Sequence, residues 1–212
     1  MGIQERKERE KQEMRNLIIE KAKQVFIEEG YDKTSIRVIA DRIEYSPATI
    51  YLYFKDKDEL LYAVHEIGFN ELYEYMKPLE QIVNPLERLR GMGELYLQYA
   101  VKNPEMYDLM FISRAPMKSL FKGAVEGDWD CGFRVFNFLC SCVQESMDRG
   151  FIRKTDLAVA TLSIWSFIHG LVSLHIRDRL NVFPEHIDIQ QLIDQALNNL
   201  IELIKEPSHA AN

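Results

Sequence analysis

Apolar residues recur at the spacing of α-helices along almost the whole chain, and the alternating pattern of β-strands is missing. One short stretch places its apolar residues at positions i, i+3, i+4 and i+7, namely Ile36, Ile39, Ala40 and Ile43. The chain has 212 residues, of which 47% are hydrophobic, so it can bury one good core or a small module and a larger one. The pattern predicts an all-α fold.

Residues that favour helix starts and ends set the expected boundaries. We expect helices over residues 9–29, 34–43, 57–77, 85–102, 104–112, 130–149, 156–180 and 188–205, with a short one after Ser46. The expected N-caps are Thr34 or Ser35, then Ser46, Asp56, Asn84 and Asn103. Residues 113–129 are expected to hold a short helix within a mobile loop. The charged start is expected to be a frayed, solvated extension, with a DNA-contacting arm as the alternative.

The corner at residues 34–61 is the most informative segment. Ser46 can cap its second helix, and Pro47 takes the first helical position, where a missing N–H is tolerated. Two short helices joined in this way have the dimensions of a helix-turn-helix, which places its second helix in the major groove of DNA. The alternative is an ordinary helical corner whose tyrosines pack against a neighbouring element.

The second helix of the corner has two different faces. Ile50 and Phe54 share one face and are expected to pack inward. The side left exposed carries Pro47, Ala48, Thr49, Tyr51 and Tyr53. Hydroxyl groups on this side can donate to phosphate oxygens, and aromatic rings can contact thymine methyl groups.

Charge is distributed unevenly along the chain. The formal net charge of −7 argues against a surface that binds nucleic acid everywhere. Residues 33–57 are nevertheless mildly basic, because they hold Lys33, Arg37, Arg42, Lys55 and Lys57 against Asp41, Glu44 and Asp56. Lys55 and Lys57 also flank a helix start, where free N–H groups already favour an anion.

The stretch FIEEGYDKTSIRVIADRIEYSPATIYLYFKDKDELL resembles the N-terminal DNA-binding domain of TetR/AcrR-type bacterial transcriptional regulators. The resemblance covers about residues 15–65 and rests on Phe26, Gly30, Tyr31, Thr34, Ser35, Ile39, Ala40, Ser46, Thr49, Ile50, Tyr51, Tyr53, Phe54, Lys57, Leu60 and Leu61. One departure is Glu44, because the family usually has Gly in the turn. A left-handed Glu44 would cost of order 1 kcal/mol relative to Gly.

The resemblance implies an N-terminal three-helix bundle with a helix-turn-helix at residues 1–60. It also implies a larger helical effector-binding and dimerisation domain at residues 61–212. By the resemblance, Arg37 reaches a guanine, and Thr49 and Tyr51 lie in the groove. Phosphate contacts are implied for Thr34, Ser46, Tyr53 and Lys57. With their neighbours Ser35, Pro47 and Lys55, these residues make up the candidate DNA-binding site.

In the C-terminal part, Trp165, His169 and Gly170 resemble the Trp-His-Gly signature of one TetR C-terminal subfamily. A lone histidine on an apolar face is more often a hydrogen-bonded core residue than a ligand contact. The aromatic and methionine-rich middle of the chain forms either a helical core or a cavity for a small apolar or aromatic effector. The candidate effector-binding residues are Tyr96, Tyr107, Phe111, Arg114, Trp129, Phe133, Phe136, Trp165 and His169.

The helices expected over residues 156–180 and 188–205 carry more apolar residues than one core can cover. Two such helices from each of two chains would form a four-helix interface, with Leu197 and Leu200 within it. A two-fold homodimer would also present two recognition helices about one DNA turn apart, as a palindromic operator requires.

These observations favour a homodimeric repressor that a small molecule releases from its operator. The alternatives are a helical small-molecule-binding or scaffold module without DNA binding, and an enzyme. The sequence has no zincin, phosphate-loop or nucleophile-elbow motif, and its histidines lack ligand spacing, so we expect no enzyme, cofactor or metal site. The odd number of cysteines, the missing export signal and the lack of an apolar run of membrane-spanning length predict a cytoplasmic protein without a membrane partner.

Overall fold

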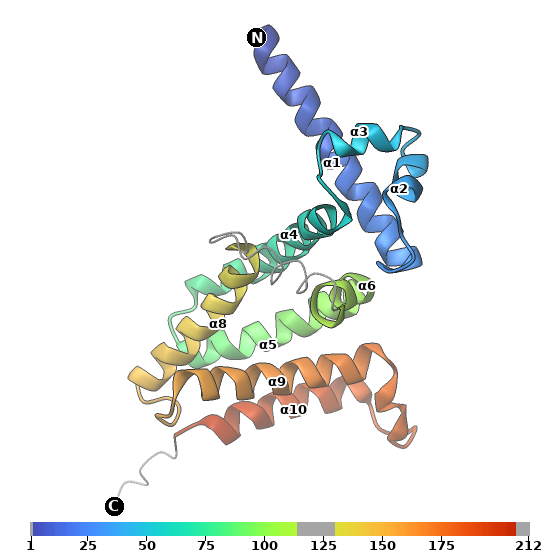
Figure 1. The fold of residues 1–212 in the computed structure, drawn as a ribbon. Helices are drawn as coiled ribbons and strands as arrows, with labels where there is room; N and C mark the ends of the chain where they lie inside the picture. Colours follow the sequence, from blue (N-terminus) through green and yellow to red (C-terminus); the bar gives the residue numbers. More distant parts are fainter. Residues whose placement is uncertain (1, 114–129, 207–212) are drawn as a thin grey trace, which may run out of the picture. The chain divides into compact units, whose positions relative to one another are not determined.

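The computed structural model describes residues 2–113 and 130–206, which are mostly helical (Figure 1). In chain order the elements are α1 (Ile3–Glu29), α2 (Ile36–Arg42), α3 (Pro47–Tyr51), α4 (Lys57–Met76), the 3₁₀ turn η1 (Lys77–Gln81), α5 (Pro85–Lys102), α6 (Pro104–Tyr107), the π-helical turn η2 (Asp108–Ile112), α8 (Asp130–Asp148), α9 (Leu157–Ile176), the 3₁₀ turn η3 (Arg179–Val182) and α10 (Ile189–Ile204). Within the described residues there is no β-strand, and Ile152 and Lys205 form an isolated antiparallel bridge. The predicted all-α fold is confirmed. The short helix predicted near residues 113–129 falls almost wholly outside the described residues.

The chain divides into two compact units. One contains Met1–Phe69 together with Glu105–Asp130, and the other contains Asn70–Pro104 together with Cys131–Asn212. Helix α4 belongs to both units, because it continues without interruption past the boundary between them. The domain boundary expected at residue 60 stays a prediction.

Local capping sets where several helices begin. The predicted N-caps accept backbone hydrogen bonds at Ser35, Ser46, Asp56 and Asn84. Asn103 differs from the prediction, since its side-chain amide donates to the carbonyl oxygen of Tyr99 at 3.0 Å and so lies at the end of α5. An N-cap replaces one of the backbone partners that a helix end lacks, so these residues fix the chain positions at which the helices start.

Helix α1 contributes one buried stripe to the core of the first unit. The buried residues are Ile18, Ile19, Ala22, Val25 and Phe26. Helix α2 packs against α1, and α3 packs against α2. Helix α1 ends at Gly30, whose φ of +80° is a conformation that residues with a Cβ rarely adopt. The three helices thus form a small bundle around one apolar centre.

Helix α1 also begins earlier than predicted. The sequence indicated a frayed extension before residue 9, whereas the helix starts at Ile3. The Gly2 N–H donates to the Glu5 carboxylate and so caps its first turn. Two ion pairs four residues apart, Arg6–Glu10 and Arg9–Glu13, hold the exposed turns that follow. Such pairs each stabilise a helix by roughly 0.2–0.5 kcal/mol, so their sum favours helix over coil in this segment.

In the first unit, α4 packs closely against α6 and η2. The Nε2 atom of His65 lies 2.7 Å from the carbonyl oxygen of Leu109, and His65 is 1% exposed. A Cβ at Gly68 would collide with the side chains of Met106 and Met110, so glycine permits this approach. Burial lowers the pKa of His65 to about 4, against a smaller opposing effect of the bond to Leu109. The imidazole is therefore neutral at pH 7.

The core of the second unit is built from α5, α9 and α10, which pack against one another (Figure 1). They meet at Gly93 of α5. A Cβ at this position would lie 3.2 Å from Ile168 Cδ1 and 3.5 Å from Leu197 Cδ2. The small residue on α5 thus lets the other two helices come together.

Helix α9 contains no Asp, Glu, Lys or Arg, although much of its surface is exposed. Its buried stripe consists of Thr161, Ile164, Ile168 and Val172, and the exposed large apolar residues are Val159, Leu162, Trp165, Phe167 and Leu174. By length and composition alone, α9 could cross a membrane, and 17% of its apolar stretch is buried. This corrects the expectation that no apolar run reaches membrane-spanning length.

Helix α10 buries part of the apolar surface that was expected to lie between chains. Leu197 is 4% exposed and Leu200 is 8% exposed within a single chain. The exposed positions are mainly polar, namely Gln190, Gln191, Asp194, Gln195, Asn198, Asn199 and Glu202, but Leu203 is also 65% exposed. Their own unit thus covers these two leucines, and a four-helix interface between two chains stays a prediction.

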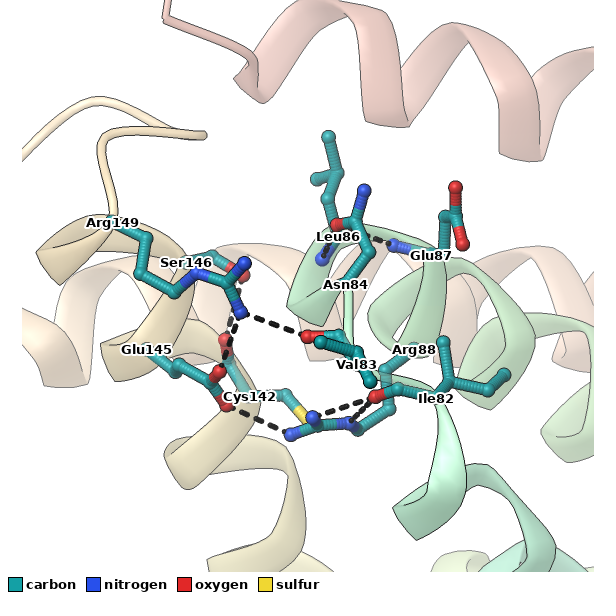
Figure 2. A network of polar contacts seen from close by, with 10 residues as sticks. All are labelled: Ile82, Val83, Asn84, Leu86, Glu87, Arg88, Cys142, Glu145, Ser146 and Arg149. Atoms are coloured by element: carbon teal, nitrogen blue, oxygen red, sulfur yellow. Dashed lines mark hydrogen bonds and ion pairs between the residues drawn. The ribbon is translucent and has the colours of Figure 1, made fainter.

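A polar network connects α8 to the segment that precedes α5 (Figure 2). Arg88 donates to the carbonyl oxygen of Ile82 from Nε at 3.0 Å and Nη2 at 2.7 Å, and its Nη1 lies 2.9 Å from Glu145 Oε2. Arg149 Nη1 lies 2.9 Å from Glu145 Oε1 and donates to the Val83 carbonyl oxygen at 2.8 Å. Arg149 and Arg88 together lower the pKa of Glu145. One carboxylate thus links two arginines that both hold the same connecting segment.

Candidate nucleic-acid interface

The turn between α2 and α3 has a defined backbone geometry. The N–H of Tyr45 donates to the carbonyl oxygen of Ala40 at 3.0 Å, and the N–H of Glu44 donates to that of Asp41 at 3.3 Å. These two bonds are those of a Schellman motif, which places the residue after the C-cap in the left-handed region. Glu44 has a φ of +58°, so the departure from the family pattern falls where glycine is favoured.

We expect Glu44→Gly to stabilise the protein by about 1 kcal/mol, because glycine adopts this conformation without a Cβ clash. Urea unfolding of wild type and variant measures the change. Asp178→Gly is the matched control, since Asp178 has a φ of +54° but aspartate tolerates this region better than glutamate. A gain at residue 178 larger than the gain at residue 44 would contradict the assignment of strain to Glu44.

Helix α3 has five residues and begins as predicted. Ser46 Oγ accepts from the Thr49 N–H at 3.2 Å and lies 3.1 Å from Thr49 Oγ1, and Pro47 takes the first helical position. Ile50 is completely buried, whereas Tyr51 is 55% exposed. The cap and the buried isoleucine hold the short helix in place, and the phenol ring of Tyr51 is presented to solvent.

Helix α2 contributes a second exposed group. Ser35 caps it by accepting from the N–H three residues further on at 3.3 Å. Arg37 in its first turn is exposed and makes no ion pair among the described residues. Arg42 at the other end is held by Glu28 at 2.9 Å and by Glu29 at 3.3 Å. Arg37 is thus the arginine of α2 whose guanidinium is available to a ligand.

Two residues assigned to phosphates by the resemblance are engaged inside the protein. Thr34 is 2% exposed, and its hydroxyl donates to the Gly30 carbonyl oxygen at 2.8 Å. Lys57 Nζ donates to the carbonyl oxygens of Tyr31 at 2.8 Å and Thr34 at 2.9 Å, and lies 3.9 Å from the centre of the Tyr31 ring. These bonds fix the start of α4 to the loop between α1 and α2. An ammonium has three donors, and these two bonds use two of them, so a phosphate contact of Lys57 stays a prediction.

Other exposed residues surround α3. Tyr53 is half-buried and Lys55 is exposed, whereas Tyr45 is 43% and Leu52 is 78% exposed. The last two were not among the predicted site residues. Leu52 could have been found from helical spacing, because it lies three residues after Thr49 and one turn further along the same side.

The candidate effector residues of the first unit form an aromatic row next to the buried histidine. The ring centres of Tyr107 and Phe111 are 5.1 Å apart, those of Phe111 and Phe69 are 5.3 Å apart, and those of Phe69 and His65 are 5.6 Å apart. Tyr107 is completely buried. This group serves as core, and any contact with an effector stays a prediction.

A second group of candidate effector residues lies in the second unit. The Tyr96 hydroxyl lies 3.1 Å from His169 Nδ1, and the ring centres of His169 and Trp165 are 6.1 Å apart. The ring centres of Phe136 and Trp165 are 6.0 Å apart. Phe133, which lies on α8 like Phe136, is 53% exposed. Burial lowers the pKa of His169, as expected for a hydrogen-bonded neutral imidazole.

Two candidate effector residues, Arg114 and Trp129, lie outside the described residues. In the part of the chain that the structure describes, no group of three or more His, Cys, Asp or Glu residues is placed to hold a metal ion. The polar groups of the second aromatic cluster are those of Tyr96 and His169, and their contact with an effector stays a prediction.

Comparison with known proteins agrees with this geometry. The family model "Bacterial regulatory proteins, tetR family" matches residues 18–64, and "Tetracyclin repressor-like, C-terminal domain" matches residues 89–200. The chain is 38% identical over 193 residues to the HTH-type transcriptional regulator HbdR of Aromatoleum sp. (strain CIB), which covers 90% of this chain and 80% of that protein.

Solved structures show the same fold at lower identity. A protein of unknown function from Rhodococcus sp. RHA1 superposes with a TM-score of 0.73 and 21% identity, covering 91% of this chain and 95% of that one. FadR of Bacillus subtilis, solved in complex with stearoyl-CoA, has a TM-score of 0.69 and 19% identity, covering 89% of this chain and 98% of that one.

A small bundle with a capped helical corner, joined to a larger helical unit, is the architecture of a DNA-binding transcriptional regulator. The chain belongs to the TetR family of bacterial regulatory proteins. Its corner, from α2 to α3, is a DNA-binding helix-turn-helix, and proteins of this family are regulators and not enzymes.

Proposed function

We propose that this protein is a homodimeric repressor that binds a palindromic operator in the cytoplasm and is released by a small molecule. The proposal rests mainly on Arg37 of the capped helix-turn-helix, which is exposed, has no ion pair with any residue that the structure describes, and shares this motif with the exposed Tyr51. An arginine in this state can form a bidentate contact with a guanine in the major groove. Lys55, which is also exposed, is suited to a phosphate.

We expect Arg37→Ala to weaken operator binding by roughly 1–3 kcal/mol and to relax the preference at one base pair. Lys55→Ala should weaken all sequences about equally and lower the salt dependence, because a phosphate contact carries no sequence information. Both residues are exposed, so neither change removes a core contact. Affinity is measured by fluorescence anisotropy on the selected operator and on random DNA at several salt concentrations.

The two variants separate base reading from charge. If Arg37→Ala weakens random DNA and operator DNA equally, the base-reading role of Arg37 is wrong. If purified wild type retains no DNA from a random-sequence pool, the proposed function is wrong, and the alternative of a helical small-molecule-binding module without DNA binding takes its place.

Helix α9 supports the homodimer. Its outer face is uncharged and carries Val159, Leu162, Phe167 and Leu174, all at least 37% exposed in one chain. An apolar face of this kind needs a cover, and a second copy of the chain supplies an identical face about a two-fold axis. The opposite face of α9 packs against α5 and α10 as part of a soluble core, which favours a protein partner over lipid.

The proposed effector is a small molecule with an apolar or aromatic part. Support comes from the cluster of Tyr96, His169, Trp165 and Phe136 in the second unit, which offers rings and one polar pair. The structure of FadR from Bacillus subtilis contains stearoyl-CoA, a molecule with a long apolar chain. The spacing of Trp165, His169 and Gly170 on α9 supports assignment of this C-terminal part to the Trp-His-Gly type.

Release from DNA requires an effector that binds the DNA-free conformation of the protein more tightly than the DNA-bound conformation. Helix α4 is suited to transmit such a change. Its first residue, Lys57, is bonded to the loop between α1 and α2, and its His65 is bonded to Leu109 of η2. A π-helical turn is an unusual local geometry that often marks a functional site. In the proposal, movement of η2 passes along α4 to the helix-turn-helix.

A further inference from the structure

The first turns of α1 project beyond the helix-turn-helix and are not part of any core (Figure 1). Residues 2–13 are all exposed, and the first buried residue of α1 is Ile18. The family model likewise begins only at residue 18. A regular helix that no apolar contact holds in place is unusual, because most helical stability in proteins comes from packing of an apolar face.

The charges on this projecting segment are sorted by face. On one side, Arg6 lies 2.7 Å from Glu10, and Arg9 lies 3.5 Å from Glu13. Those two arginines are neutralised by their own helix. The opposite side carries Lys7, Lys11 and Arg15 at intervals of four residues, which places them next to one another along the helix.

The positive charges of Lys7 and Lys11 are not neutralised by ion pairs within the described part of the helix. Neither Lys7 nor Lys11 makes an ion pair or hydrogen bond among the described residues. Glu8 and Glu10 border the row, and Glu10 is paired with Arg6. Like charges four residues apart destabilise a helix by a few tenths of a kcal/mol. An anion placed along the row would remove this repulsion.

The row faces the same side as the helix-turn-helix. Lys7, Lys11 and Arg15 lie on the helix face that continues as the buried stripe from Ile18, against which α2 packs. The guanidinium of Arg15 lies 5.1 Å from the ring centre of Phe54, which directly precedes the exposed Lys55. The row of Lys7, Lys11 and Arg15 therefore continues the basic surface that Lys55 forms after α3.

We propose that the segment Ile3–Met14 is a DNA-binding arm in which Lys7 and Lys11 contact backbone phosphates next to the operator. The proposal rests on the proposed function, since it adds flanking contacts to the same DNA. Twelve residues of helix are about 18 Å long, which matches the rise of about five base pairs. The contacts carry charge only, so they add affinity at any flanking sequence.

The test uses the full-length protein and the DNA that wild type selects from a random-sequence pool. One duplex contains only the selected sequence, and a second adds about ten base pairs on each side. We expect Lys7→Gln/Lys11→Gln to weaken binding to the long duplex at least about tenfold and to lower its salt slope by about two per protomer, since each phosphate contact contributes about 0.9. Binding to the short duplex should stay at the wild-type value.

Two further variants give the matched controls. Arg6→Gln/Arg9→Gln removes the same charge from the ion-paired face and should retain most of the affinity for the long duplex. Lys7→Arg/Lys11→Arg keeps the charge and should bind like wild type. Circular dichroism should show unchanged helix content in Lys7→Gln/Lys11→Gln, because the change removes a repulsion.

Each contrary result has a distinct meaning. Wild-type affinity of Lys7→Gln/Lys11→Gln for the long duplex overturns the arm, and so does an equal loss on both duplexes or an equal loss in Arg6→Gln/Arg9→Gln. In these cases the selected DNA is still bound by wild type, so the proposed function stands. A wild type that selects no DNA overturns both. If Lys7→Gln/Lys11→Gln loses binding to anionic vesicles but keeps its DNA affinity, the row binds a membrane surface, and the proposed DNA-binding arm is overturned as well.

Discussion

Replacing Leu162 with glutamate should convert the protein into a monomer that no longer binds its operator. Leu162 is 58% exposed on the uncharged outer face of α9, so a single chain does not need it for its core. In a two-fold interface the new carboxylate occurs twice and loses water without gaining a partner, which costs several kcal/mol. The dimer dissociation constant should rise at least about a thousandfold, equivalent to roughly 4 kcal/mol. Sedimentation velocity and operator binding on the same samples measure the two effects.

The control is a glutamate at an exposed apolar residue outside α9. Val182 is 83% exposed in η3, and Val182→Glu should leave both the dimer and operator affinity unchanged. Because both positions are exposed in one chain, neither change should lower the stability of the monomer by more than about 0.5 kcal/mol. A Leu162→Glu protein that sediments as a dimer and binds the operator normally would place the interface elsewhere.

Several parts of the fold could be predicted because they depend on neighbouring residues only. Ser46 and Pro47 define the start of α3 through one side-chain bond and one fixed φ angle. Asn84 and Pro85 do the same for α5, which runs over the predicted range. The start of α1 was missed because its stability depends on several weak ion pairs, none of which alone predicts a helix.

The parts that could not be predicted depend on residues far apart in the chain. The sequence gives no sign of an internal partner for Lys57, but tertiary packing brings its ammonium to the carbonyl oxygens of Tyr31 and Thr34. Leu197 looks like an interface residue, but it is covered by α5 at Gly93. The helical pattern shows that a residue needs a cover, and only the packing shows which element provides it.

Lowering the pH should destabilise the folded protein through His65. Burial lowers its pKa from 6.5 to about 4. Between these two values the unfolded chain binds a proton at His65 that the folded chain does not, so the unfolding free energy decreases as the pH falls through this window. By pH 4 the loss from this one residue should be about 3 kcal/mol. Urea unfolding at pH 7 and pH 4 measures it.

The variant His65→Gln isolates the effect of His65. Glutamine can still donate to the Leu109 carbonyl oxygen but does not titrate, so its unfolding free energy should fall by about 3 kcal/mol less than that of wild type between the two pH values. His169→Gln is the matched control and should show a smaller difference, because His169 is only half-buried.

The physical basis is a shortage of partners for the second nitrogen. The Nδ1 atom of His65 is buried and has no hydrogen-bond partner among residues 2–113 and 130–206, while Nε2 donates to the Leu109 carbonyl oxygen. Protonation would create a second buried donor and a charge in a site from which water is excluded. The contact between α4 and η2 should therefore weaken first in acid, and hydrogen exchange should increase at Leu109 and its neighbours before α9 and α10. Simultaneous exchange in all helices would show that His65 does not control this contact.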